Sequence, residues 1–466
     1  MTDRMLRRTL WLIAGASLGA VACKDSTSVT DLNNVSAEAL SGGLTRASTQ
    51  LLVTGLINST RGDLDSRYIV FSESMARDFY RLDNAENRYI TETIGGPADY
   101  SGFLGGGAFS QFYVTVRAGN TILNALPSAT GLSAAEASAT KGLTRTFNAI
   151  ALYRTLELRD SLGIAIDVNH PIEDPPAAFV CKPNALASIS ASLDSAAAEL
   201  AAGGTSFPFT LPGGFTSNGK FDTPATFLRL NRAFKGKVEL YRGLSRQKPN
   251  AGSFDAAITA LTAAIGANPT TAAGMQDGVY NTYSTNAGET RYPIADANIF
   301  LNPAVGDSIL AGDARKSKIQ TVASKSLFGV TSTYKTVLTD PANLTRPAPI
   351  IKVSEMILLR AQAKIEKNDL AGATADINLV RTLDGGLAPI AVPATKAAAI
   401  DAVLYEKRYS LLAESAQRLV DLRAYSRLNA TYLKKELSGD IFQSTLPIPK
   451  RELDTRGVTS ISPTCS

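Results

Sequence analysis

The sequence predicts a mainly α-helical protein made of about four repeated helix pairs, interrupted by long loop-rich insertions. Three observations support this prediction. Apolar residues recur at the spacing of amphipathic helices, the helical segments come in pairs, and segments rich in Gly and Pro separate them. A composition of 44% hydrophobic and 19% charged residues also excludes a disordered or collagen-like chain.

The chain begins with the pattern of a secretory signal. Three arginines precede a short apolar stretch over 10–22, and small residues lead up to Cys23, which resembles a bacterial lipobox. We predict a signal peptide over 1–22, a lipidated tether over 23–35 and a single domain over 36–466. Cys23 would then carry fatty acids such as palmitate. The alternative is ordinary signal cleavage beside an incidental cysteine.

In the first half of the domain, helices are predicted where amphipathic runs carry start and stop signals. Ser36 provides an N-cap for the first helix, and Pro127 ends the third. The segments 84–107 and 161–183 are predicted to be loops, because the first contains clustered glycines and the second contains Pro171, Pro175 and Pro176. The expected helices cover 36–59, 66–83, 108–126, 133–160 and 184–202.

Helix pairs recur in the second half. Ala361 and Ala373 lie twelve residues apart, which is the spacing of the two small residues that let the paired helices of a tetratricopeptide unit approach closely. The insertion 267–349 is poor in helix signals, and we expect loops and short strands there. The expected pairs are 133–160 with 184–202, 223–245 with 253–265, 352–367 with 370–382, and 396–412 with 415–428.

Residue types argue against catalysis and against a metal site. The sequence has one His, three Cys and one Trp, so His-based metal sites and His-dependent triads are not expected. It contains neither a nucleophile elbow nor a phosphate-binding Gly-rich loop. We therefore predict no enzymatic activity, no cofactor and no metal. A net charge of +5, scattered along the chain, does not predict binding to nucleic acid.

Two cysteines follow the lipobox, Cys181 and Cys465. In an oxidising, exported compartment they could form a disulfide. The alternative is one buried thiol and one thiol in a loose tail, and the sequence does not decide between the two.

The C-terminal third carries a series of charged and polar motif residues, among them Glu355, Asn378, Arg381, Glu406, Arg408, Glu414, Arg418, Asp421 and Arg423, followed by Leu446 to Pro449. These motifs resemble those of the SusD/RagB family of outer-membrane nutrient-binding lipoproteins, in which Leu446 to Pro449 would be the closing motif. The chain departs from the family pattern at Lys352, where the family has Arg, and at Gln362, where it has Glu.

These matching residues are interpreted as structural rather than as a binding site. Glu414 and Arg418 lie four residues apart on one predicted helix, and Asp421 follows one turn later. We expect an ion-pair network that joins the last repeat to its neighbour.

The resemblance implies a lipid-anchored protein on the outer membrane, facing the cell surface. By this resemblance it would bind an oligosaccharide or a similar oligomeric nutrient and pass it to a TonB-dependent, SusC-like transporter. A helical-repeat adaptor lipoprotein that binds a protein partner is the alternative, and a hydrolase is a third possibility. A neighbouring gene for a TonB-dependent barrel would distinguish the first hypothesis from the others.

Two polar, aromatic-rich loops are the predicted ligand-binding regions. Ten aromatic residues lie between residues 68 and 113, although aromatics make up 7% of the chain. Aromatic faces offer broad apolar contact while Asn, Asp and Arg orient hydroxyl groups. The alternative is that the tyrosines cover the repeat core. The candidates are Arg88, Tyr89, Asp99, Tyr100 and Phe103 in the first loop, and Tyr280, Asn281, Tyr283, Arg291 and Tyr292 in the second.

Overall fold

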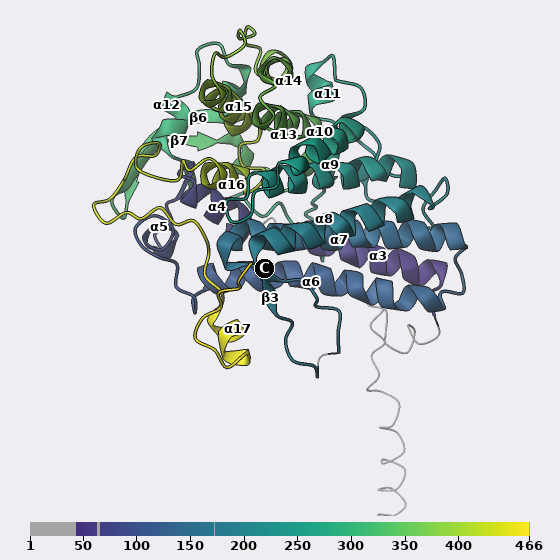
Figure 1. The fold of residues 1–466 in the computed structure, drawn as a ribbon. Coiled ribbons are helices and arrows are strands. Elements are labelled where there is room, and N and C mark those ends of the chain that lie inside the picture. The colour runs from purple at the N-terminus through teal and green to yellow at the C-terminus, as the bar shows by residue number, and fades with distance from the viewer. Residues whose placement is uncertain (1–42, 63–65, 172, 466) are drawn as a thin grey trace, which may run out of the picture.

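The computed structural model describes residues 43–62, 66–171 and 173–465. The predicted signal peptide, Cys23 and the tether lie outside these residues. Within them, a row of antiparallel-paired helices forms the body of the protein (Figure 1). Each helix packs against the next in the order α3, α6, α7, α8, α9, α10 and α13, and α13 also packs against α14 and α15. The prediction of a mainly α-helical, tetratricopeptide-like fold is confirmed.

The predicted helix pairs correspond to helices of the structure with shifts of a few residues at their ends. Two of these helices carry N-terminal caps, since Ser133 and Glu136 form a capping box and Thr223 accepts a hydrogen bond from the backbone of Thr226. The helices of the array are α3 (Arg46–Gly62), α6 (Phe103–Ala125), α7 (Ala134–Arg159), α8 (Lys182–Ala201), α9 (Pro224–Gly243), α10 (Gly252–Ile265), α13 (Val353–Glu366), α14 (Leu370–Leu383), α15 (Lys396–Ser410) and α16 (Gln417–Ala424).

The prediction of one helix over 66–83 is wrong. A π-helical turn (Ser66–Val70) and the short α4 (Phe71–Met75) are followed by strand β1 (Phe79–Arg81). Arg77 has a φ of 61°, a left-handed conformation that ends the helix. The aromatic residues that follow favour a strand, and β1 pairs antiparallel with β5 (Ile299–Leu301).

The first predicted loop is also shorter than expected. It contains the one-turn helix α5 (Arg88–Thr91), and α6 already begins at Phe103. The three glycines at 105–107 therefore lie inside a helix, although each costs about 1 kcal/mol relative to Ala. Buried contacts of Leu104 and Phe112 along the same helix offset this cost.

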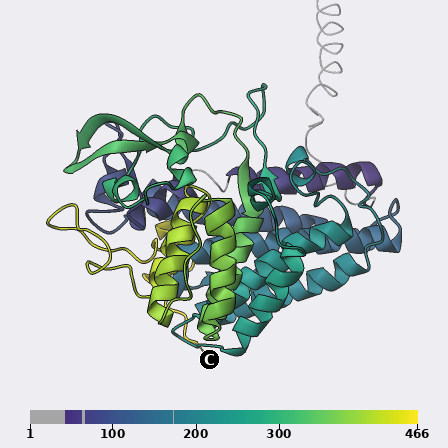
Figure 2. The ribbon, with the colours of Figure 1, turned by 90° about the horizontal axis from the view of Figure 1, so that it is seen from above.

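The insertion 267–349 consists mainly of short strands and turns, as predicted, and it also contains the short helices α11 (Ala272–Met275) and α12 (Pro303–Asp307). Within the described residues the strands form two-stranded antiparallel sheets, pairing β1 with β5, β2 with β3, β4 with β8, and β6 with β7. The β6–β7 hairpin projects to one side of the helix array (Figure 2). The remaining strands are β2 (Ile164–Ala165), β3 (Phe179–Val180), β4 (Gly278–Asn281), β6 (Ile319–Leu327), β7 (Val330–Thr336) and β8 (Ala348–Lys352).

Residues of the family motif lie in a buried network of charges between the last repeats. Asp421 accepts from Lys407 at 2.7 Å, and Gln362 bridges the same two side chains at 2.9 and 2.7 Å. Lys352 pairs with Glu414. Lys352 and Gln362, which depart from the family pattern, therefore still bond to other members of the network.

Glu414 and Arg418 do not pair with each other. Arg418 instead lies 3.7 Å from Asp78, which also accepts from Arg408 at 2.7 Å. These contacts join α15 and α16 to the segment between α4 and β1. The remaining family-motif residues hold neighbouring elements. Glu355 pairs with Lys237, Glu406 with Arg315 and Arg381, and the Asn378 amide with the backbone of Ile390.

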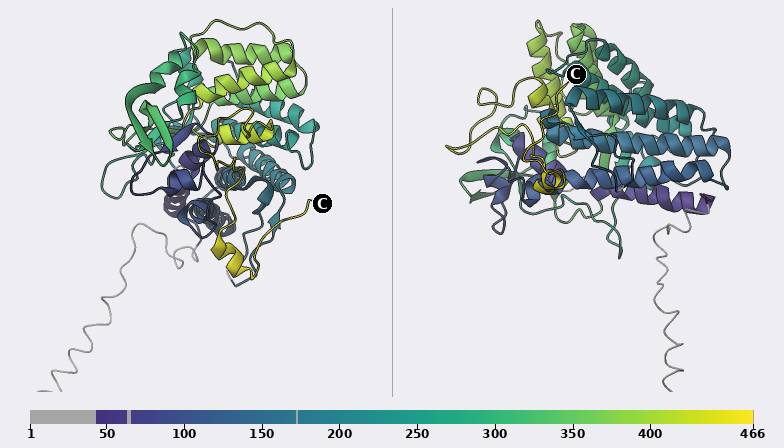
Figure 3. Two further views of the ribbon diagram at one scale, coloured as in Figure 1. Left: turned by 90° about the vertical axis from the view of Figure 1, so that its left-hand side faces the viewer. Right: turned by 60° about the horizontal axis from the view of Figure 1, so that its bottom comes forward.

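A disulfide ties the C-terminal tail to the helix array. Cys181, the N-cap residue of α8, is fully buried and is bonded to Cys465, with 5.4 Å between the Cα atoms. The tail first forms the short helix α17 (Lys450–Thr455), which lies below the array, as Figure 3 shows. None of the described helices is long and apolar enough to cross a membrane.

Candidate functional site

Residues of the first predicted loop are divided between the core and the surface. The Tyr89 ring is buried against Phe71, with ring centroids 5.6 Å apart, and the guanidinium of Arg81 lies 4.0 Å from the Tyr89 centroid. Arg88 is partly exposed and donates to Glu86 at 2.8 Å. Tyr89 was expected in an accessible loop and is instead a core residue, because α5 packs it inward.

The other members of this set lie toward the start of α6. Asp99 and Tyr100 are exposed, and Asp99 accepts from the backbone and hydroxyl of Ser101. The backbone carbonyl of Tyr100 accepts from the N–H of Lys450, the first residue of α17. Phe103 begins α6, and its side chain lies outside the described residues.

The second predicted loop is mostly internal. Tyr283 and Tyr292 are buried and pack edge to face with centroids 5.5 Å apart. Asn281 is also buried and accepts from Thr60 on α3 at 3.1 Å. These three residues join the insertion to the array, so the expectation that they face solvent is wrong. Tyr280 is half-buried and donates to the carbonyl of Gln276, whereas Arg291 is exposed.

The structure does not bring the two predicted loops together into one cavity. An ion pair between Arg81, which lies beside Tyr89, and Asp296, at 2.9 Å, links the neighbourhoods of the two loops. Arg88, Tyr100 and Arg291 keep accessible side chains, whereas the buried tyrosines offer a ligand no stacking surface.

The structure instead places an elongated groove along one face of α6. Phe109, Tyr113, Arg117, Asn120 and Asn124 lie along it at helical spacing, over about 22 Å of helix. Two adjoining cavities, of about 620 and 630 Å³, form the groove and share Arg117 and Asn120. We call it the α6 groove. Volumes of this size are typical of small-molecule sites.

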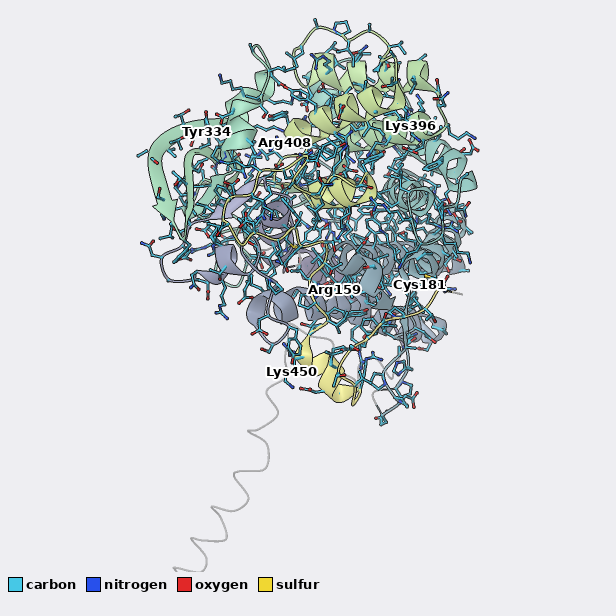
Figure 4. The ribbon with its side chains drawn as sticks, turned by 60° about the vertical axis from the view of Figure 1, so that its left-hand side comes forward. Arg159, Cys181, Tyr334, Lys396, Arg408 and Lys450 are labelled. Atoms are coloured by element: carbon cyan, nitrogen blue, oxygen red, sulfur yellow. A yellow bond between two sulfur atoms is a disulfide. The ribbon has the colours of Figure 1, made fainter. Side chains whose placement is uncertain are left out.

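Three segments far apart in sequence form the walls of the α6 groove. One is α6, the second is the proline-rich segment between β2 and β3, and the third is α17. Figure 4 shows Lys450, at the start of α17, below the helices that carry Arg159. Leu453 of α17 and Ile448 pack with Phe109, Ala165 and Phe179 in a small apolar cluster at the base of the groove. The tail therefore forms part of the site.

One end of the groove is aromatic and rigid. Phe109 lies against Phe179 with nearly parallel rings, 6.1 Å between centroids, and Tyr113 lies 5.0 Å from Phe109. The Tyr113 hydroxyl donates to the carbonyl of Ala165 at 2.9 Å and accepts from its N–H at 3.1 Å. Burial raises the pKa of the Tyr113 phenol, so this double contact is kept at neutral pH.

Arginines surround this aromatic end. The Arg159 guanidinium is fully buried behind Phe109, 5.2 Å from the ring centroid, and burial lowers its pKa to about 9. It remains charged at pH 7. Arg456 lies 4.9 Å from the Phe179 centroid and donates to Glu452 at 2.7 and 2.9 Å. Arg159 therefore fixes Phe109 from behind the groove, and Arg456, which lines the groove, fixes Phe179.

The other end of the groove is rich in amides and hydroxyls. Asn124 and Asn169 exchange two hydrogen bonds across the groove, at 2.9 and 3.0 Å. Asn120 accepts from Asn148 at 3.0 Å, and the His170 ring contacts the carbonyl of Pro171. These groups can donate to and accept from hydroxyls of a bound oligomer, while the aromatic end supplies apolar contact.

The α6 groove could not be identified from the sequence alone. Phe109, Phe112 and Tyr113 have the spacing of core residues, and Phe112 is indeed buried. One sequence signal was present, since the polar residues Arg117, Asn120 and Asn124 recur at helical spacing along one face of this helix. The opposite walls come from segments about 50 and 340 positions further along the chain, which no local pattern connects to α6.

Known proteins of similar structure share this architecture. A SusD superfamily protein from Bacteroides thetaiotaomicron aligns over 90% of this chain and 100% of its own, with a TM-score of 0.68 and 16% identity. A SusD-like carbohydrate-binding protein from Bacteroides vulgatus aligns over 91% and 99%, with a TM-score of 0.65 and 13% identity. A laminarin-binding SusD-like protein aligns over 90% and 99%, with a TM-score of 0.62 and 16% identity.

No family model and no curated protein matches the sequence itself. The structural comparisons define the class. This chain is a tetratricopeptide-like helical-repeat protein with the SusD-like fold, as the resemblance predicted.

Proposed function

We propose that this protein is a nutrient-binding protein that holds an oligosaccharide in the α6 groove. The observation that carries the proposal is the groove itself, which joins a rigid aromatic end to an amide-rich end in a SusD-like fold. The two structural neighbours described as binding carbohydrate or laminarin support a glycan as the ligand. The groove is open along about 22 Å of α6, which suits an oligomer better than a single sugar.

Anchoring and transport extend the proposal. The lipobox around Cys23 would hold the protein on the outer membrane, facing the cell surface, where it would pass its ligand to a TonB-dependent transporter. Binding without chemistry is the activity that the groove supports. Glu452, a carboxylate in its wall, is held in an ion pair by Arg456.

Filling the groove tests the binding site. Val114 is 52% exposed and lines the groove, so Val114→Arg should block the ligand without disturbing the core. We expect at least a tenfold loss of affinity, measured by calorimetry against a panel of neutral oligosaccharides and peptides. Val392→Arg is the matched control, because Val392 is 54% exposed and lies outside the groove.

The same titrations include three variants of the predicted loops, Arg88→Ala, Tyr100→Ala and Arg291→Ala. Wild-type affinity in Val114→Arg, together with weaker binding in one of these three, would refute the α6 groove as the site. If a peptide binds tightly and no sugar binds, then the ligand is a peptide and the proposed oligosaccharide is wrong.

Replacing Cys23 by Ala tests the anchor. Stable attachment to a bilayer requires two or more acyl chains, so the variant should move from the membrane fraction to the soluble fraction. Labelling with a radioactive fatty acid should mark the wild type and not the variant. An unlabelled wild type would exclude lipidation at Cys23.

A further inference from the structure

A second cavity, on another part of the surface, has three basic and four hydroxyl side chains among its fifteen lining residues. It has a volume of about 440 Å³ and lies where the C-terminal ends of α7, α9 and α16 meet the N-terminal end of α8. We call it the basic cavity. The lining residues used below are Asp160, Lys182, Ser245, Arg246, Arg423 and Ser426.

The charge of the basic cavity is unbalanced. Lys182, Arg246 and Arg423 line it, and Asp160 is the single carboxylate among its described lining residues. Asp160 pairs with Lys182 and lies 3.9 Å from Arg423. Burial lowers the pKa of Lys182, and the charges of Arg423 and Arg246 lower it further. The described lining of the cavity therefore carries three cationic side chains and one carboxylate.

The two arginines are fixed in place by the backbone. Arg423 donates to the carbonyl of Ser444 at 2.7 Å and also to that of Glu157. Arg246 donates to the carbonyl of Arg423 at 3.0 Å and to the Ser426 hydroxyl, in both cases through Nη2. A guanidinium has five N–H donors, so these contacts leave donors of Arg246 for a ligand.

A buried hydroxyl in the same cavity has no hydrogen-bond partner. Ser245 is 2% exposed, and its Oγ contacts no donor or acceptor among the described residues. A buried, unsatisfied hydroxyl lowers stability, so native structures rarely keep one without a reason. An oxygen atom of a bound anion would accept from this hydroxyl.

The N-terminus of α8 adds to the positive potential. This helix of 20 residues begins at Lys182, and its N-cap residue Cys181 makes no side-chain capping bond. The positive end of a helix dipole attracts anions. The disulfide of Cys181 holds this helix end in position beside the cavity.

We propose that the basic cavity binds a small tetrahedral oxyanion, a sulfate or phosphate group. Lys182 and Arg246 balance its charge, and Ser245 donates to one of its oxygens. This is a second site, separate from the α6 groove, which shares none of the lining residues of the basic cavity.

The test titrates the whole protein with inorganic sulfate and with inorganic phosphate, in calorimetry at constant ionic strength set with chloride. We expect saturable binding and a rise in melting temperature. Arg246→Gln should weaken binding about tenfold, and Arg246→Lys should restore part of it. Galactose 6-sulfate is titrated as well. Its tighter binding than free sulfate would identify a sulfated sugar as the ligand, and the reverse order would identify the free anion.

Ser245→Ala separates a role of Ser245 in anion binding from a role in folding, because the two roles predict different changes in stability and in sulfate affinity. In chloride the variant should be as stable as the wild type or more stable, because it removes an unsatisfied hydroxyl, yet it should bind sulfate several-fold more weakly. Lys434→Gln is the charge-matched control, since Lys434 is 80% exposed and lies outside the cavity.

Three results would overturn the proposal. These are no saturable binding in the wild type, wild-type affinity in both Arg246→Gln and Ser245→Ala, or an equal loss in Lys434→Gln. Val114→Arg should leave sulfate binding unchanged, so failure of this proposal is distinguishable from failure of the α6 groove.

Discussion

Asp78→Ala should lower the free energy of unfolding by about 3–5 kcal/mol, the range seen when one partner of a buried ion pair is removed. Asp78 is 1% exposed and accepts from Arg408 at 2.7 and 3.1 Å, with Arg418 3.7 Å away. Without the carboxylate, two guanidinium groups remain partly buried without this acceptor. The measurement is urea unfolding followed by circular dichroism.

Asp401→Ala is the matched control. Asp401 is 65% exposed and pairs with Arg427, and exposed ion pairs contribute about 0–1 kcal/mol. Equal losses in the two variants would show that the Asp78 cluster contributes no more than a surface pair. A double variant with apolar residues at 78 and 408 should regain much of the loss, because it leaves neither partner of the pair charged.

The second large effect concerns the disulfide. Cys465→Ser should lower the free energy of unfolding by about 2–5 kcal/mol under oxidising conditions. The two cysteines are 284 residues apart, so the bond constrains most of the unfolded chain. Cys465 is exposed, and its replacement leaves the buried Cys181 packing in place.

Wild type and Cys465→Ser should unfold at the same urea concentration once a reductant is added. If they already coincide without reductant, then the disulfide contributes no stability. In oxidising buffer the C-terminal tail of the variant is no longer bonded to Cys181 at the start of α8. Limited proteolysis should therefore cleave this tail faster in the variant than in the wild type.

The parts of the fold that the sequence predicts well have local signals. The capping box at Ser133, the Thr223 cap and the small residues Ala361 and Ala373 each mark an element or a close contact within a few turns. Predictions over 66–83 were wrong because a single left-handed residue, Arg77, breaks an otherwise amphipathic run. The prediction of a loop up to residue 107 was wrong for the opposite reason. Burial of the flanking helix outweighs the low helix propensity of the glycines at 105–107.

The candidate site was harder to predict because burial depends on partners distant in sequence. Tyr89, Tyr283 and Tyr292 have polar neighbours in the sequence, which suggested surface loops, yet each packs on an element that no local pattern reveals. A network of the charged motif residues was expected, but their helical spacing did not reveal its pairs, because Glu414 precedes the start of α16 and does not pair with Arg418. Their partners Lys352, Asp78 and Lys407 became evident only in the structure.

The short pair of strands β2 and β3 has a consequence for how such a protein can change. Ile164 pairs with Val180 and Ala165 with Phe179, so both ends of the intervening segment are fixed at one point beside the helices. That segment forms a wall of the α6 groove while remaining outside the repeats. Its length and composition can therefore vary, by insertion or exchange, with little effect on the helix array. One wall of the α6 groove can then change while the helix array, which supplies the α6 wall, keeps its core.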